Sequence, residues 1–266
     1  MFLLQQPKDS PSLRKLIKLI NVSIPNRVDL IVYGKGLELP AFTAENYFST
    51  IKSSIIKISN VYELLIMEIP YVEISNIIGF LGDEKELYEL LNGLESLRIS
   101  GIIYFCGKNN LKPRTNLISI YNVDQTLCEI NLSLSILKSL ISYKTERERR
   151  LGEQLTDLSD LDDWVKEKAK QFDSSLPILL SPLLIPAKSY LEKIGFNVLT
   201  YFDNKILGDI QIVYTGADMH TLRPIASSLR TSAKKVKEIL IDVDPLIAPI
   251  YLSMILFYLK EIRGGL

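Results

Sequence analysis

One pattern occurs twice in this chain: an apolar strand, a tight turn, and a helix that opens near a Pro-Ala pair. The first copy runs from Arg27 to Thr50 and the second from Leu176 to Phe196. A turn of this kind joins the carboxyl end of a buried strand to the N-terminus of a helix. Backbone N–H groups and the helix dipole favour anions there, phosphate above all. The repeat therefore predicts two similar halves, each with an edge that suits an anion.

The strands predicted in both halves are apolar throughout and alternate with helical segments. Fully apolar strands joined by helices indicate a parallel sheet that is covered on both faces. We therefore predict an α/β fold with two doubly wound domains, each a mainly parallel sheet flanked by helices. The predicted strands are 28–32, 54–58, 72–80, 101–106, 117–121, 177–180, 197–201, 210–214 and 236–243.

The order of these segments predicts where the domains begin and end. Residues 1–25 form an N-terminal arm and helix, with Ser10 as the N-cap. Residues 26–150 form the first domain, and residues 151–266 form a linker helix and the second domain. Two long helices are expected at 124–143 and 246–262, and the charged run 144–152 is interpreted as a solvated helix or linker.

The charge balance excludes several classes of partner. The chain has 31 basic and 31 acidic residues, so it gives no electrostatic case for nucleic acid or an acidic membrane. The longest apolar stretch, Leu246 to Leu259, is too short to cross a bilayer, and Met1 to Leu4 is too short for a signal peptide. We expect a cytoplasmic protein. The two cysteines cannot make a disulfide framework or a metal cluster, and Cys106 is expected to be a buried, inert thiol.

Four motifs together resemble the sugar isomerase (SIS) superfamily, in the tandem form of the isomerase part of glutamine–fructose-6-phosphate amidotransferase. They are the arm Leu4-Gln5-Gln6-Pro7, the turn Gly34-Lys35-Gly36 with Pro40-Ala41, the stretch Ile77–Leu87 at the place of the phosphate loop, and Asp244–Ile250 before the last helix. The resemblance implies a SIS fold, a sugar phosphate or related small anion as ligand, and no metal or other cofactor.

The chain also departs from the family pattern. The hydroxyl residues of the family's phosphate loop are replaced by Gly79, Leu81, Glu84 and Leu87, and Leu37-Glu38 stands in place of Thr-Ser in the first turn. The family's catalytic His loop and its C-terminal Lys have no counterpart, and the lone His220 follows a strand rather than preceding one.

The candidate site residues lie in the turns that face the ligand edge. Aldose–ketose isomerisation needs a carboxylate base, and Glu38 is the weak candidate for that catalytic role. The candidate ligand-binding residues are Gly34, Lys35, Gly36, Gly82, Asp83 and Glu84. Three of them also have a structural interpretation: Gly34 and Gly36 would allow positive φ in any such turn, and Asp83 is a natural N-cap that forms a capping box with Glu86.

Two functions from different classes follow. The first is a SIS-type protein that binds a phosphosugar or another carbohydrate derivative, with weak or lost catalysis. The second is an active phosphosugar isomerase or deaminase with a rearranged site. The missing phosphate-loop hydroxyls favour the first.

The last helix predicts the oligomeric state. It carries Ile250, Tyr251, Met254, Ile255, Phe257, Tyr258 and Leu259, so it is apolar nearly all round. A helix of this kind is buried on more than one side, and SIS-like domains pair through helices. We expect a homodimer in sedimentation at micromolar concentration, and a clean monomer there would contradict this prediction.

Overall fold

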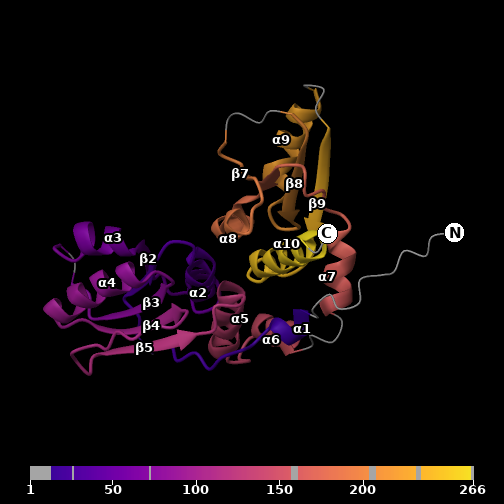
Figure 1. Cartoon of the computed structure of the whole chain (residues 1–266). Coiled ribbons are helices and arrows are strands. Elements are labelled where there is room, and N and C mark those ends of the chain that lie inside the picture. Colours follow the sequence, from indigo (N-terminus) through magenta and orange to yellow (C-terminus); the bar gives the residue numbers. More distant parts are fainter. Residues whose placement is uncertain are drawn as a thin grey trace.

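The computed structural model describes residues 13–25, 27–71, 73–156, 161–203, 208–231 and 235–264. The arm Leu4–Pro7 and the cap Ser10 of the sequence analysis lie outside these residues. The described chain contains two separate parallel sheets with helices packed around them (Figure 1). The predicted α/β fold with two doubly wound sheets is therefore confirmed.

The first sheet has five strands in the order β2-β1-β3-β4-β5, all parallel. Its helices pack on both faces, as fully apolar parallel strands require. The strands are β1 (Leu30–Tyr33), β2 (Lys57–Asn60), β3 (Asn76–Leu81), β4 (Ser100–Cys106) and β5 (Ile118–Val123). The helices of this half are α1 (Leu13–Leu16), α2 (Glu38–Thr50), α3 (Val61–Glu63) with the π-helical turn Leu64–Glu68, α4 (Glu84–Leu97) and α5 (Cys128–Leu140).

The second sheet has four parallel strands in the order β7-β6-β8-β9, which repeats the order of the first four strands of the first sheet. Its strands are β6 (Ile178–Leu180), β7 (Val198–Thr200), β8 (Ile210–Thr215) and β9 (Val236–Ile241). The helices are α6 (Glu146–Thr156), α7 (Leu161–Ala169), the 3-10 helix Pro182–Ala187, α8 (Lys188–Lys193), α9 (Met219–Thr231) and α10 (Ala248–Gly264). The predicted domain boundary near residue 150 falls inside α6 and remains a prediction.

Several predicted element bounds are wrong. The strand predicted at 54–58 begins only at Lys57, and Ile55 is 95% exposed. The strand predicted from residue 72 begins at Asn76. The helix predicted from residue 124 begins at Cys128, because Leu127 adopts a left-handed conformation with φ 50°. Apolar residues alone therefore did not mark where these elements start.

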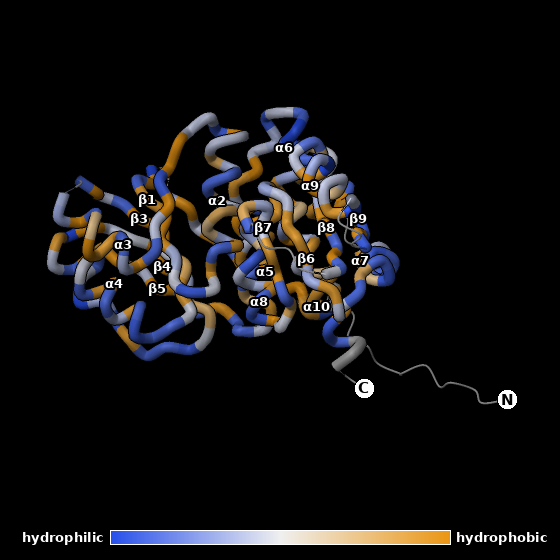
Figure 2. Tube along the Cα trace, turned by 90° about the horizontal axis from the view of Figure 1, so that it is seen from above, coloured by the Kyte–Doolittle hydropathy of each residue, from blue (hydrophilic) through white to orange (hydrophobic). Residues whose placement is uncertain are grey.

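The hydropathy of the chain follows its layers (Figure 2). The strands are mainly hydrophobic and lie inside, whereas hydrophilic residues gather on the outer turns and helices. Among the described residues, no helix combines the length and the apolar character needed to span a membrane.

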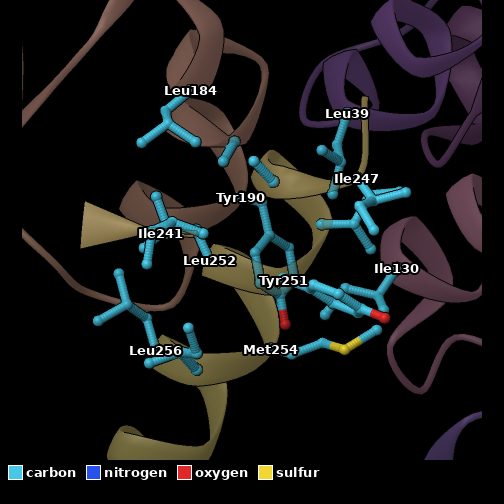
Figure 3. Packing of buried hydrophobic residues seen from close by; sticks show 14 of the residues in the cluster. Leu39, Ile130, Leu184, Tyr190, Ile241, Ile247, Tyr251, Leu252, Met254 and Leu256 are labelled. Carbon is cyan, nitrogen blue, oxygen red and sulfur yellow. The ribbon is translucent and has the colours of Figure 1, made fainter. Parts of the chain in front are cut away.

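The two halves share one core, which lies between the sheets. It combines residues of α2 and α5 from the first half with residues of β6, β9 and α10 from the second. Figure 3 shows Tyr190 and Tyr251 at its centre, close to Ile130 of α5 and Ile247. The helix α10 is buried on several sides, as predicted, but its partners belong to the same chain. Its apolar surface therefore gives no support to the homodimer, which stays a prediction.

The charged run 144–152 does more than a solvated linker would. Arg147 binds the carboxylate of Asp244 through two nitrogens, at 3.1 and 3.0 Å. The Glu148 side chain is 1% exposed and accepts hydrogen bonds from the Tyr47 hydroxyl (2.7 Å) and the Lys144 backbone N–H (3.0 Å). The interpretation of the whole run as solvated was therefore wrong, since two of its residues tie α6 to α2 and to the second half.

Glu148 makes stability depend on pH. Burial alone raises the pKa of Glu148, but hydrogen bonds from Tyr47, Ser142 and Thr145 outweigh it and hold the pKa below its ordinary value of 4.5. A depressed pKa adds stability above the pKa of the unfolded chain, and this stability is lost as pH falls through the folded pKa.

We predict that Glu148→Gln lowers the free energy of unfolding at neutral pH by about 1.5–3 kcal/mol, the usual contribution of hydrogen bonds to a charged group. The deficit should shrink as pH falls below about 4.5, because the unfolded wild-type chain then takes up a proton at Glu148 and the advantage of the folded carboxylate is progressively lost. Urea unfolding over a pH series measures both effects. The control is Glu146→Gln on the same helix, whose side chain is 58% exposed and should matter little. A deficit independent of pH would contradict the prediction.

Candidate active site

A pocket of about 480 Å³ lies at the carboxyl edge of the first sheet. It sits where the strand order reverses, because the chain leaves β1 to one side and β3 to the other. Ligands of doubly wound sheets bind at this place. The pocket is lined by Lys35, Leu37, Tyr62, Gly82, Asp83, Lys85, Glu86, Cys106, Gln125, Cys128 and Lys193.

The turn after β1 depends on its two glycines. Gly36 has φ +83°, a conformation that residues other than glycine rarely adopt. At Gly34 a Cβ atom would lie 2.2 Å from Oε2 of Glu86, so only glycine lets that carboxylate approach the turn. Glu86 uses this space to accept a hydrogen bond from the Lys35 backbone N–H, at 3.2 Å.

The turn after β3 is closed by its own N-cap. The Asp83 side chain accepts hydrogen bonds from the backbone N–H groups of Lys85 (2.8 Å) and Glu86 (3.0 Å). The predicted N-cap is therefore confirmed. The capping box is not formed as predicted, because the Glu86 carboxylate reaches across to Lys35 in the β1–α2 turn instead.

Carboxylates of the chain thus hold backbone donors of both turns that face the pocket. Asp83 occupies the start of α4, and Glu86 occupies the β1–α2 turn. A free phosphate would have to compete with both for these N–H groups. An anion in this pocket would therefore meet side chains more than a backbone cradle.

The second half contains a carboxylate that, like Glu86, binds a backbone N–H of a neighbouring turn. Asp218, just before α9, accepts hydrogen bonds from the Leu183 backbone N–H (3.1 Å) in the turn after β6 and from Thr215 at the end of β8 (2.8 Å). Glu86 and Asp218 therefore do the same thing at equivalent edges of the two sheets. The arrangement fixes the spacing between the turns in each half.

Two carboxylates near the first edge differ from ordinary surface acids. Burial raises the pKa of Glu86; the Lys35 N–H opposes this rise, while nearby Asp83 and Glu38 add to it. Glu38 stands in the first turn of α2, and its Oε2 atom is buried without a hydrogen-bond partner among the described residues. Burial raises the pKa of Tyr33, and the nearby charge of Glu38 raises it further. A carboxyl with a raised pKa is suited to proton transfer near neutral pH.

Three lysines supply positive charge to the pocket, against two acidic residues. Lys35 makes no ion pair with any residue that the structure describes, and Lys85 lies 3.9 Å from Glu89. Lys193 comes from α8 in the second half, and it pairs with Glu129, which is 2% exposed. The pocket therefore collects cations from both halves of the chain.

A disulfide bond forms part of the pocket wall. It joins Cys106 at the end of β4 to Cys128 at the start of α5. The prediction of an inert free thiol at Cys106 was wrong. The two positions are 22 residues apart, and only the packing of α5 against the sheet brings them together.

The predicted site residues do not all reach the pocket. Lys35, Gly82 and Asp83 line it, and Gly34 and Gly36 shape the adjoining turn. Glu84 is exposed and does not line it, Glu38 is half-buried and does not line it either, and His220 is an exposed residue of α9. Lining residues that the sequence analysis did not propose for the site are Leu37, Tyr62, Lys85, Glu86, Cys106, Gln125, Cys128 and Lys193. The sequence did contain a signal for Glu86, because an acid three residues after an N-cap can accept a hydrogen bond from its own turn or from a neighbouring one.

Comparisons with known proteins identify the fold. No protein-family model matches the sequence, and no curated protein matches it significantly. Solved structures do match. Glucosamine-6-phosphate deaminase from Thermotoga maritima superposes with a TM-score of 0.65 at 15% identity, over 90% of this chain and 87% of that one. The chain shares the α/β fold of its SIS-like structural neighbours.

Two further structures support this conclusion. Tagatose-6-phosphate ketose/aldose isomerase from Escherichia coli matches with a TM-score of 0.63 at 11% identity, over 95% of this chain and 85% of that one. The C-terminal domain of glucosamine-fructose-6-phosphate aminotransferase from Francisella tularensis matches with a TM-score of 0.56 at 13% identity, over 89% and 85%. Identities this low show a shared fold and leave the activity to the site itself.

We predict that Glu86→Gln stabilises the chain at neutral pH. Because the folded pKa of Glu86 is raised, its contribution to stability is full below the unfolded pKa, near 4.5, and is lost as pH rises through the folded pKa. The neutral amide keeps an acceptor for Lys35 and avoids that loss. The urea midpoints of variant and wild type should converge in acid and separate toward neutral pH. Glu84→Gln, an exposed acid on the same turn, is the control, and a variant that is weaker at neutral pH would contradict the prediction.

Proposed function

We propose that the pocket between β1 and β3 binds a sugar phosphate or a related small anion, and that the chain turns such ligands over weakly or not at all. One observation carries the proposal. Lysines line the pocket, whereas Asp83 and Glu86 already occupy backbone donors that would otherwise hold a phosphate.

The composition of the wall supports binding more than catalysis. No serine or threonine is among the described residues that line the pocket. In the SIS family such hydroxyls donate to the phosphate, and losing even one well-placed donor typically costs a few kcal/mol of transition-state stabilisation. Flexible lysine side chains attract an anion but do not hold it rigidly.

The fold neighbours support the ligand class. The solved structures named above are a glucosamine-6-phosphate deaminase, a tagatose-6-phosphate isomerase and part of a fructose-6-phosphate aminotransferase. All three names concern sugar phosphates. We carry over this shared ligand class and no individual substrate.

A second function is favoured by one specific observation. Glu38 has a buried, unpaired carboxylate oxygen, and Glu86 has a raised pKa beside it. Such a pair could supply the base for an active isomerase or deaminase with a rearranged site. This alternative requires turnover that depends on one of these two carboxylates.

The location, the oligomeric state and the partners of the protein are also proposals. We propose a cytoplasmic protein that works as a homodimer and has no nucleic-acid or membrane partner. The balanced charge of the chain supports the last part. Analytical ultracentrifugation of the full chain measures the oligomeric state directly.

We predict that Lys35→Gln weakens binding of fructose 6-phosphate by about tenfold or more, since a hydrogen bond to a charged group contributes roughly 1.5–3 kcal/mol. Lys35 suits this test because its removal leaves no described carboxylate without a partner. The measurement is a thermal shift against ligand concentration, with glucose 6-phosphate and glucosamine 6-phosphate in parallel. Lys138→Gln removes the same charge from an exposed position on α5 and should leave binding unchanged. Equal affinities of the two variants would refute the role of Lys35.

The same protein decides between the two functions. A coupled assay with fructose 6-phosphate and ammonia or glutamine should show little or no turnover. Robust turnover that disappears in Glu38→Gln or Glu86→Gln, while thermal-shift binding persists, would establish the active enzyme and end the case for a binding role.

A further inference from the structure

We propose that the Cys106–Cys128 disulfide is a redox-sensitive part of the pocket wall, so that its reduction loosens the start of α5 and weakens ligand binding. The part about ligand affinity rests on the proposed function. The part about α5 does not, and it can be tested without any ligand.

The disulfide lies where the end of β4 meets the start of α5 in the pocket wall. Cys106 is the last residue of β4 and Cys128 the first residue of α5, with their Cα atoms 5.8 Å apart. Both residues line the pocket. The Cβ atom of Cys106 also lies 3.8 Å from the place where Gly82 would carry a Cβ. Cys106 therefore lies next to the β3–α4 turn.

The start of α5 is packed in the core but has no described side-chain cap. Leu127 precedes the helix with φ 50°, a conformation that is unfavourable for a residue with a side chain, and no described side chain caps the first turn. By contrast, the start of α4 has the Asp83 cap. The covalent bond at Cys128 thus adds a link between the sheet and the uncapped first turn of α5.

The next residue extends the effect to the second half. Glu129 pairs with Lys193 of α8, and Lys193 lines the pocket. If the first turn of α5 moves, the position of this lysine changes with it. The disulfide is therefore connected, through Glu129, to a cationic side chain of the pocket.

The chemical step is an ordinary thiol–disulfide exchange. A dithiol reductant attacks one sulfur as a thiolate, the S–S bond breaks, and two electrons and two protons end on Cys106 and Cys128 as thiols. The reductant leaves as its own cyclic disulfide. Two thiol sulfurs in van der Waals contact lie farther apart than bonded ones, so the two side chains must move apart at the junction of β4 and α5. Cys106 is the accessible end, with 7% exposure against 1% for Cys128.

The proposed location gives this step a role. Cytosolic thiols are kept reduced, and disulfides there are usually transient, catalytic or redox-sensing. A disulfide beside a ligand pocket in that compartment would couple ligand binding to the supply of reducing equivalents.

The first experiment follows hydrogen exchange of the full chain with and without dithiothreitol. Mass spectrometry after alkylation counts the free thiols in each sample. We expect none without the reductant, two with it, and faster exchange in peptides covering residues 124–132 after reduction, while the capped start of α4 keeps its rate. Free thiols in the untreated protein, or unchanged exchange on reduction, would overturn the proposal whatever the pocket binds.

The second experiment measures thermal-shift affinity for fructose 6-phosphate and inorganic phosphate in both states. We expect reduction to weaken binding about fivefold or more, the low end of coupling between linked sites. The variant Cys106→Ser/Cys128→Ser should match reduced wild type in either condition; if it does not fold, the comparison of oxidised and reduced wild type decides alone. Equal affinity in both states overturns the coupling. Absence of binding in both states, with altered exchange, refutes the proposed function and leaves the redox-sensitive α5 standing.

Discussion

The packing of α5 is the constraint on which the rest of the structure depends. Its residues from Cys128 to Leu137 are all buried, with one face in the core of the first sheet and the other in the core shared with the second half. A helix buried all round cannot leave either core without exposing the other. Its polar residues are used as well: Asn131 and Ser135 accept hydrogen bonds from the backbone of Lys18 and Ile20, and so fix the N-terminal segment. Together with α2 in the shared core, α5 therefore holds both halves in one arrangement.

At the carboxyl edge of each sheet, one carboxylate from the start of a helix accepts a hydrogen bond from the neighbouring strand–helix turn. Glu86 and Asp218 satisfy backbone N–H groups that helix starts leave open. In a phosphate-binding site the ligand would satisfy such groups. Here the chain does so itself, which makes the edge stable without a ligand. The physical cost is a buried acid with a raised pKa at Glu86, and that cost keeps both a binding and a proton-transfer role open to experiment.

The pocket that remains is built from both halves and closed by a covalent bond. Lys193 of α8 lies at the pocket because it forms an ion pair with Glu129 of α5. Cys128 bonds to Cys106 because α5 starts at the edge of the sheet. The wall is thus a consequence of the helix arrangement. Changes that move α5 should alter charge and shape in the pocket together.

The sequence by itself determined the α/β fold, the repeated strand–turn–helix unit and the Asp83 cap, because these follow from local patterns of apolar residues and from one side chain reaching its own backbone. It also pointed to the two turns whose residues Lys35, Gly82 and Asp83 line the pocket. The tertiary structure alone decided that Glu86 serves the other turn, that Lys193 joins the pocket and that Cys106 meets Cys128. Each of these contacts joins residues far apart in the chain, and such a contact depends on how helices pack across a sheet, which no local pattern encodes.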